Sequence, residues 1–418
     1  MTRPAGSKLN KHSQDCSLVL DGREVKFRLL AERQETQTPV HVDWLRFTCQ
    51  IRNAPLPCVD VLFPDYDQQG DDESAHEHDV RKNRLDWLAK SLRQLPAEEH
   101  APGYLALELA SKVADALGDD FSVNREVKKG HDFYRHRISL ERHGAEVGWI
   151  GFLASGDSPR QKAQSKTLHV NLYGTACTFA RSGWRDAMAD LVDETEATIT
   201  RVDLALDFFE GIAGGMDRIK SDYESGLMNS GGKRLKCNMV GDWSQSSEGG
   251  RSFYIGSKEA GKQTNVYEKG DQLFGVQENN PWQRIELRYG NKFRVFPSDV
   301  LRRPADFFAG ASDWHAAMLR EVEKTEVIPQ PVACEKRLQD ESILAEVTRN
   351  VRWLREIAGP SLSLAFQYMR ENDFLSMVTP QQLPRRLAKF SLSEIKTALN
   401  GTIRKAFHAA SPASLQPA

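Results

Sequence analysis

Apolar and polar residues alternate along several short stretches of the chain, which is the pattern of β-strands with one buried face. The first clear case is the segment VHVDWLRFTC at residues 40–49. The same pattern returns at residues 134–140, 148–153 and 168–174, and it is strongest at 198–209. Shorter stretches of strand character follow in the next eighty or so residues. We therefore expect a sheet built mainly from antiparallel strands.

Helical spacing of apolar residues appears between these strands. Residues 85–95 and 105–117 carry leucine or valine at every third or fourth position, which predicts two amphipathic helices. Further helices are expected at 184–192 and 216–227, whereas the acidic stretch 65–79 is expected to be a solvated loop. Strands grouped together with helices between them predict an α+β fold with an antiparallel-rich sheet core.

The pattern changes at both ends of the chain. Residues 1–36 are polar and lack clear periodicity, so we expect a flexible N-terminal arm that contains at most a small hairpin. Residues 37–310 form the expected mixed domain. Leucine and alanine periodicity in 311–408 predicts a helical C-terminal region, and the tail 409–418, rich in Ser, Pro and Ala, is expected to be disordered.

Composition excludes several classes of protein. Hydrophobic residues make up 40% of the 418 residues and charged residues 27%, and no stretch approaches the ~20 apolar residues of a membrane-spanning helix. The N-terminus has no apolar signal core, so we expect a cytoplasmic protein without a membrane role. The six cysteines form no C-x-x-C pair, which argues against a zinc site or a disulfide framework. Because the net charge is -2, any contact with nucleic acid must use a local basic surface.

Two aspartates share the polar face of the strongest strand. In the segment TRVDLALDF at 200–208, the strand period of two places Asp203 and Asp207 on one face, roughly 13 Å apart along the backbone. Aspartate is rare inside strands, so the pair requires a cation, basic partners or solvent. A half-exposed strand with a polar face explains the pattern equally well.

A predicted hairpin at 251–270 carries the candidate nucleophile. In its second arm Asn265, Tyr267 and Lys269 point to the polar side. A tyrosine near a cation is suited to attack phosphorus, because the cation lowers the cost of forming the phenolate. Tyr254 in the first arm is the competing nucleophile, and most tyrosines in such positions are simply amphipathic sheet residues.

A third strand combines one acid with two cations. In WQRIELRY at 282–289, Arg284, Glu286 and Arg288 share a face. The glutamate is a candidate metal ligand, and the guanidinium groups on either side of it suit bidentate contact with phosphate. Alternatively, these residues form a row of alternating charges on the protein surface.

Taken together and in this order, three motifs resemble those of the Rep_trans family, the rolling-circle replication initiators of small plasmids and of some phages. They are TRVDLALDF at 200–208, YIGSK with NVYEK at 254–269, and WQRIELR at 282–288. The motif-bearing stretch runs from about residue 40 to 308. The resemblance therefore implies that 37–310 is a catalytic nicking domain.

The resemblance also implies a site-specific DNA endonuclease and strand transferase. Tyr267 would be the nucleophile, leaving a 5′-phosphotyrosyl link and a free 3′-OH primer. Asp203 and Glu286, with Asp207 as a third acidic candidate, would hold Mg²⁺ or Mn²⁺, hard cations that suit carboxylate oxygens. The sequence departs from the family pattern at Asn265, where arginine is usual, and at Arg288, where some plasmid members carry a second acid.

Partners follow from the same resemblance. They would be origin DNA, as supercoiled duplex and as a single-stranded nick site, a host helicase and polymerase in a bacterial cytoplasm, and a second copy in a homodimer. The C-terminal helices would serve DNA recognition or oligomerisation. The basic residues expected to hold DNA are Arg251, Lys258, Lys262, Lys269, Arg284 and Arg288. Two alternatives are a non-catalytic origin-binding regulator and a metal-dependent nuclease that uses water as nucleophile.

Overall fold

The computed structural model describes residues 21–96, 100–230, 232–243, 250–322, 327–332, 336–379, 383–384, 387–388 and 390–408. The chain divides into two compact units. The first comprises residues 1–291 and 295–332, and the second comprises 292–294 and 333–418. The expected division at residue 310 therefore differs from the observed one, because the helix at Asp313–Val322 still belongs to the first unit.

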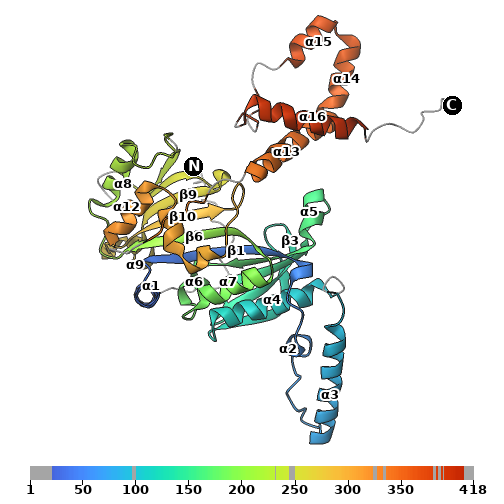
Figure 1. Cartoon of the computed structure of the whole chain (residues 1–418), viewed down its shortest axis with the longest axis vertical. Coiled ribbons are helices and arrows are strands. Elements are labelled where there is room, and N and C mark those ends of the chain that lie inside the picture. The colour runs from blue at the N-terminus through green and yellow to red at the C-terminus, as the bar shows by residue number, and fades with distance from the viewer. Residues whose placement is uncertain are drawn as a thin grey trace, which may run out of the picture. The chain divides into compact units, whose positions relative to one another are not determined.

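In the described part of the chain, ten strands form one antiparallel sheet in the first unit (Figure 1). Their order across the sheet is β2-β3-β4-β5-β1-β6-β10-β9-β8-β7. The predicted α+β class with an antiparallel-rich sheet is confirmed. The strands are β1 (Val40–Gln50), β2 (Phe121–Lys129), β3 (Tyr134–Arg142), β4 (Ala145–Ala154), β5 (Thr167–Leu172), β6 (Thr198–Phe208), β7 (Cys237–Val240), β8 (Ser252–Ser257), β9 (Lys262–Glu268) and β10 (Gln283–Gly290).

Helices connect these strands and make up the second unit, as the periodicity predicted. Those of the first unit are α1 (Gly22–Thr36), α2 (Val59–Leu62), α3 (Ala75–Leu92), α4 (Pro102–Leu117), α5 (Pro159–Gln164), α6 (Gly174–Phe179), α7 (Trp184–Glu194), α8 (Gly215–Glu224), α9 (Lys269–Phe274), α10 (Asp299–Arg302), α11 (Pro304–Ala309) and α12 (Asp313–Val322). Those of the second are α13 (Lys336–Trp353), α14 (Gly359–Tyr368), α15 (Glu371–Val378) and α16 (Leu392–His408). Short 3₁₀ turns occur at Ile51–Asn53, Lys258–Ala260 and Val276–Glu278, and a π turn at Leu354–Ala358.

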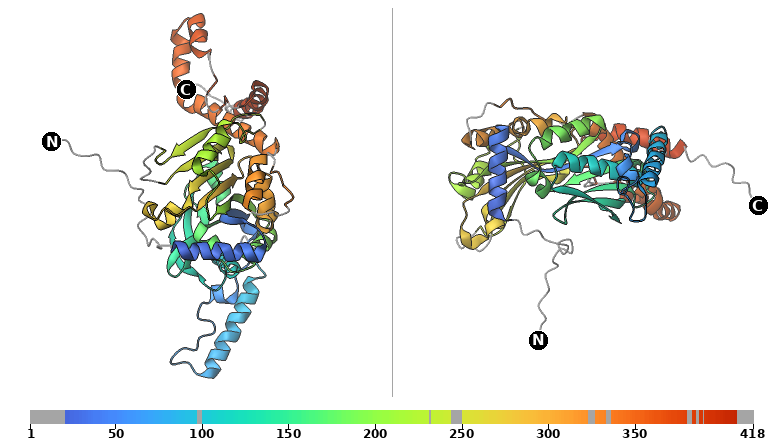
Figure 2. Two further views of the ribbon diagram at one scale, coloured as in Figure 1. Left: turned by 90° about the vertical axis from the view of Figure 1, so that its left-hand side faces the viewer. Right: turned by 90° about the horizontal axis from the view of Figure 1, so that it is seen from below.

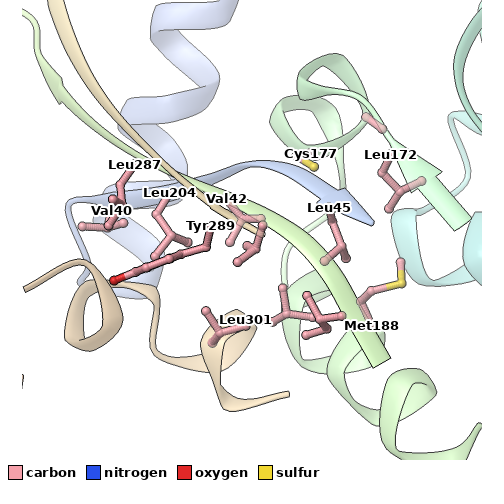
Figure 3. Close-up of a cluster of buried hydrophobic side chains, with 14 of the residues drawn as sticks. Val40, Val42, Leu45, Leu172, Cys177, Met188, Leu204, Leu287, Tyr289 and Leu301 are labelled. Atoms are coloured by element: carbon pink, nitrogen blue, oxygen red, sulfur yellow. The ribbon is translucent and has the colours of Figure 1, made fainter. Parts of the chain in front are cut away.

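The apolar face of the central strands forms the core of the first unit. Leu45 of β1, Leu204 of β6 and Leu287 of β10 are fully buried, and they belong to one cluster with Met188 of α7 and Leu301 of α10 (Figure 3). Each buried leucine contributes about 1.5–3 kcal/mol relative to its exposed state. Since neighbouring residues in a strand point to opposite faces, this packing directs the alternate, polar positions to the other face of the sheet.

The N-terminal segment that the structure describes is a helix, which corrects the expectation of a flexible arm or hairpin. The carboxylate of Asp21 accepts a hydrogen bond from the backbone N–H of Arg23 and caps α1. Val25 and Leu29, one helical turn apart, are buried, and α1 contacts β1, α6 and α9 (Figure 2). Only this pair faces the core, so the apolar period was too weak to predict a helix. Residues 1–20 and the tail 409–418 lie outside the described residues.

Two further elements differ from expectation. Helix α3 begins at Ala75, inside the predicted acidic loop, because Ser74 and Glu77 form a reciprocal capping box. Strand β2 was not predicted. It lies at one edge of the sheet and pairs only with β3, and several of its side chains are exposed and charged, as is usual for an edge strand.

A buried histidine makes the stability of the first unit depend on pH. His315 of α12 is 5% exposed, with Nε2 3.0 Å from Thr264 Oγ1 and Nδ1 2.8 Å from Ser312 Oγ. Burial, with a smaller effect of Lys262, lowers the pKa of His315 to about 3. The unfolded chain therefore takes up this proton first, near pH 6.5, and stability falls as the pH drops from there toward 3.

We expect the His315→Gln variant to lose less stability on acidification than the parent protein. Glutamine can keep hydrogen bonds to both hydroxyls but takes up no proton. Between pH 7 and pH 5 the parent should lose about 2 kcal/mol more of its free energy of unfolding than the variant does. Urea unfolding at the two pH values measures the difference, and parallel losses would show that His315 does not titrate on unfolding.

Candidate functional site

The candidate site residues lie on three neighbouring strands, β6, β10 and β9, and share the polar face of the sheet. Arg288 pairs with Asp203 and Arg284 with Asp207 in the register of β10 and β6. On its other side, β10 places Arg284 beside Tyr267 of β9. The structure thus brings together the three motifs that the sequence separates.

Asp207 lies at the centre of a buried network of ion pairs. Its Oδ1 accepts hydrogen bonds from Arg284 Nε at 2.7 Å and from Trp282 Nε1 at 2.6 Å, and its Oδ2 accepts one from Arg284 Nη2 at 2.9 Å. The Nη1 of Arg284 donates to Asp43 Oδ1 at 2.6 Å. The side chains of Arg284 and Asp207 are only 1% and 2% exposed. Arg284 therefore anchors two carboxylates, and its guanidinium is not available to grip DNA.

Electrostatics explains why this network stays charged. Burial alone would lower the pKa of Arg284, but Asp207 and Asp43 raise it well above its usual value. Burial alone would also raise the pKa of Asp43, but Arg284, with help from Lys269 and His41, lowers it. Each charge thus stabilises its partner. Asp43 was not among the predicted residues, although an aspartate inside an otherwise apolar strand is a signal that could have identified it.

A second group of charges surrounds Asp203. Its Oδ1 accepts a hydrogen bond from Arg201 Nε at 2.9 Å, and its Oδ2 contacts Arg201 Nη2. Arg288 Nε lies 3.2 Å from Asp203 Oδ2, while Arg288 Nη2 lies 3.1 Å from Glu286 Oε1. One guanidinium, 25% exposed, therefore bridges the carboxylates of Asp203 and Glu286. These two carboxylates converge on the same cation.

Glu286 has the more unusual carboxyl of the pair. Burial, followed by the negative charges of Asp43 and Asp203, raises its pKa to about 7, and this rise outweighs the effect of Arg288 and Arg284. Within the described residues, however, no group of three or more His, Cys, Asp and Glu side chains is arranged to hold a metal ion. The site therefore offers two converging carboxylates, one of which, Glu286, is buried in surroundings that disfavour its charged form.

Tyr267 lines a cavity of about 460 Å³, together with Tyr254, Asn265, Glu286 and Arg288. We call it the Tyr267 cavity. Burial raises the pKa of Tyr267 well above its usual value; Arg284 opposes this rise, while Glu286 and Asp43 reinforce it. The sequence had suggested that a nearby cation would favour the phenolate. Arg284 does act in that direction, but in the protein without bound DNA burial and the carboxylates outweigh it.

Lys269 lies over the ring of Tyr267. Its Nζ lies 5.7 Å from the ring centroid and donates a hydrogen bond to Gln272 Oε1 at 2.9 Å. Burial, followed by the positive charge of Arg284, lowers the pKa of Lys269 to about 8. Lys269 is still mainly protonated at neutral pH.

The other predicted cations divide between two neighbouring cavities. Arg251, Lys258 and Arg288 line the Tyr267 cavity, although Arg251 is held by Glu268 through a 2.7 Å contact. Lys258 and Arg288 also line a second, larger cavity together with Lys262. Of the six predicted DNA-binding residues, Arg284 is thus the one whose guanidinium is enclosed.

The comparisons with known proteins bear on these strands. Residues 197–378 match the model of the Rep_trans family, described as replication initiation factor. The expected resemblance to Rep_trans is confirmed. The Rep_trans segment holds β6 to β10 and with them Asp203, Tyr267 and Glu286, and it extends into the second unit as far as the end of α15. Strands β1 to β5 precede it.

The chain resembles the structure of a rolling circle replication initiator protein from Geobacillus stearothermophilus, with a TM-score of 0.39 and 16% sequence identity over 72% of this chain and 94% of that chain. No curated protein matches the chain. None of the helices described in the structure is long and apolar enough to cross a membrane.

Proposed function

We propose that this chain is a rolling-circle replication initiator that nicks one DNA strand at an origin and stays attached to its 5′ end. The observation that carries the proposal is the position of Tyr267. It opens into a cavity within the Rep_trans segment, between the carboxylate of Glu286 and the cations Arg288 and Lys258. A hydroxyl nucleophile among fixed charges is the arrangement that transfer of a phosphodiester requires.

The proposed reaction is a transesterification. Tyr267 Oη forms a bond to phosphorus while the bond from phosphorus to the 3′ oxygen breaks, and that oxygen takes a proton and leaves as a 3′-OH. Because burial raises the pKa of Tyr267, its proton has to leave during the attack rather than before it. Arg288 and Lys258 would offset the charge that develops on the phosphate oxygens.

We also propose that Asp203 and Glu286 hold Mg²⁺ or Mn²⁺. Their carboxylates converge on one cation, Arg288, and their hard oxygens suit either metal. Burial first, and then the charges of Asp43 and Asp203, raise the pKa of Glu286, and a cation bound beside it would favour its charged form. When bound, the metal would polarise a phosphate oxygen. Asp207 fits less well because its partner Arg284 is only 1% exposed, whereas Arg288, which bridges Asp203 and Glu286, is 25% exposed; we assign Asp207 instead to positioning Arg284.

Removal of the metal should stop cleavage. EDTA is expected to abolish it, and Mg²⁺ or Mn²⁺ should restore it in the parent protein. Asp203→Asn or Glu286→Gln should reduce metal affinity by at least about tenfold and resist that rescue. Titration of Mn²⁺ into DNA-free protein measures the affinity directly. Arg288→Gln is the informative counterpart, because removing the competing guanidinium should tighten metal binding. Cleavage at full rate in EDTA would contradict the metal proposal.

Covalent capture of DNA tests the function without knowledge of the origin. The full chain is incubated with a pool of random single-stranded oligonucleotides and Mn²⁺, then separated on a denaturing gel. A label at the 3′ end should remain on the protein, whereas a label at the 5′ end should appear on a free fragment that a polymerase can extend. A hydrolytic nuclease would cleave without retaining either label. A non-catalytic regulator would bind DNA without cleaving it.

A further inference from the structure

A second cavity, of about 750 Å³, lies beside the Tyr267 cavity on the polar face of the sheet. We call it the Arg46 cavity. Arg46 and Thr48 of β1, His169 of β5 and Arg201 of β6 line it, and Lys258 and Arg288 line both cavities. Strands β1 and β5 precede the Rep_trans segment. The family match therefore covers only part of the cavity. Arg201, Lys258, Lys262 and Arg288 lie within the matched residues, whereas Arg46, Thr48 and His169 precede them.

The charges of the two cavities differ. The residues lining the Tyr267 cavity include three cations (Arg251, Lys258, Arg288) and three carboxylates (Glu268, Asp271, Glu286). Those lining the Arg46 cavity include five cations and a single carboxylate, that of Asp132. A polyanion whose reacting phosphate lies at Tyr267 would therefore be drawn toward the Arg46 cavity, although the whole chain carries a net charge of -2.

An exposed aromatic ring stands at this cavity. Phe133 also lines it, in the turn between β2 and β3, and is 66% exposed. Both Asp132 and Phe133 have left-handed backbone conformations, with φ of 51° and 72°. Such conformations are unfavourable for residues other than glycine, and a bulky phenyl ring gains little from exposure to water. Stability of the fold therefore does not explain why an exposed phenyl ring occupies this turn.

The turn that carries Phe133 is held from three sides. Arg46 Nη1 donates to Asp132 Oδ2 at 2.9 Å, and Gln164 Nε2 donates to the Asp132 carbonyl at 3.0 Å. The backbone N–H of Ser155 donates to the Phe133 carbonyl at 2.9 Å. Because the backbone of the turn is already held, stacking of the ring against a ligand would have to order only the Phe133 side chain.

The wall of the cavity also contains an unsatisfied polar atom. His169 is 7% exposed and stacks on Tyr134, with ring centroids 5.6 Å apart and planes at 13°. Its Nδ1 lies 2.8 Å from Thr48 Oγ1, whereas its Nε2 is buried and has no hydrogen-bond partner in the protein. Within the residues that the structure describes, Nε2 thus lacks a partner, and because His169 lines the cavity, a ligand bound there can supply one.

We propose that the Arg46 cavity binds the unpaired DNA strand next to the nick, with Phe133 stacking on a base and Arg46 contacting a phosphate. A cationic groove with an aromatic platform is the usual arrangement for binding single strands without reading their sequence. The inference rests on the proposed function, since it takes Tyr267 as the point of cleavage. It adds a binding site whose aromatic ring, Phe133, and proposed phosphate contact, Arg46, lie before the Rep_trans segment.

Binding of oligothymidylates tests the cavity separately from cleavage. Fluorescent (dT)6 and (dT)20 are titrated with the full chain carrying Tyr267→Phe, at low and moderate salt. Adding Phe133→Ala should weaken binding of (dT)20 about tenfold by removing one stacked base. Adding Arg46→Gln should reduce the slope of log affinity against log salt by about 0.7, the value for one phosphate of a single strand. Trp87→Ala is the matched control, because Trp87 is also 66% exposed but lies on α3.

A further variant separates binding from folding. Phe133→Gly relieves the left-handed conformation, so it should weaken binding of (dT)20 without lowering the melting temperature. Unchanged affinity of both Phe133 variants and of Arg46→Gln would overturn the inference. Covalent adducts formed by a protein that shows no binding to (dT)20 would also overturn it. If (dT)20 binds through Phe133 but no adduct forms in the capture assay, the result supports DNA binding in the Arg46 cavity and contradicts the proposed nicking function.

Discussion

The Tyr267→Phe variant is expected to lose strand cleavage by more than about a thousandfold while binding DNA as the parent protein does. The substitution removes one oxygen, the proposed nucleophile. It keeps the ring, which is half-buried on β9 and adjacent to Arg284 of β10. The assay with a 3′ label follows the covalent adduct directly, and binding to (dT)20 follows the fold and the DNA-binding surface in the same preparation.

Tyr254→Phe is the matched control. Tyr254 lies on β8, pairs with Asn265 and lines the same cavity as Tyr267, so it shares the surroundings of the proposed nucleophile. The same loss of one oxygen should leave cleavage nearly unchanged there. If Tyr254→Phe were inactive and Tyr267→Phe active, the nucleophile would belong to the other arm of the hairpin. If both variants cleaved, neither tyrosine would be the nucleophile.

The directions of the site residues could be predicted from the sequence because a strand alternates with a fixed period. Asp203 and Asp207 do share one face of β6, and Arg284, Glu286 and Arg288 share the matching face of β10. The two-residue period of the strands also distinguished these polar positions from the buried leucines. The α+β class followed from the same alternation. The roles of these residues in catalysis, metal binding and DNA binding stay predictions. The contacts described above determine which substitution tests each role.

The contacts between distant segments could not be predicted. Arg284 reaches Asp43 across 241 residues of sequence, and nothing in either local pattern names the other. The raised pKa of Tyr267 likewise depends on burial and on carboxylates from other strands. Helix α1 was missed for a related reason, since Val25 and Leu29 become informative only once the surface that buries them is known. Periodicity determines which way a side chain points, whereas its partner depends on the register of the sheet.

The Asp43–Arg284–Asp207 ion pairs should therefore be a major source of stability. Arg284→Met is expected to lower the free energy of unfolding by about 3–5 kcal/mol, because it leaves the buried charge of Asp207 without its partner. Replacing Asp207 as well, in Arg284→Met/Asp207→Leu, removes one of the two carboxylates that Arg284 pairs and leaves Asp43, so it should recover part of that loss. Urea unfolding of the three proteins measures both effects. A loss below about 1 kcal/mol in the single variant would contradict a buried, paired Asp207.

The double variant also separates the role of Arg284 in protein stability from its proposed role beside Tyr267. Arg284 lies beside Tyr267 in the register of β10 and β9, and it is the cation that most opposes the rise in the pKa of Tyr267. A stable Arg284→Met/Asp207→Leu protein should therefore cleave slowly at neutral pH and recover part of its rate at higher pH, where the phenol loses its proton more easily. Tyr267→Phe, by contrast, should stay inactive at every pH. A double variant that is fully active at neutral pH would restrict the network to a structural role, because a folded protein without Arg284 would then still activate Tyr267.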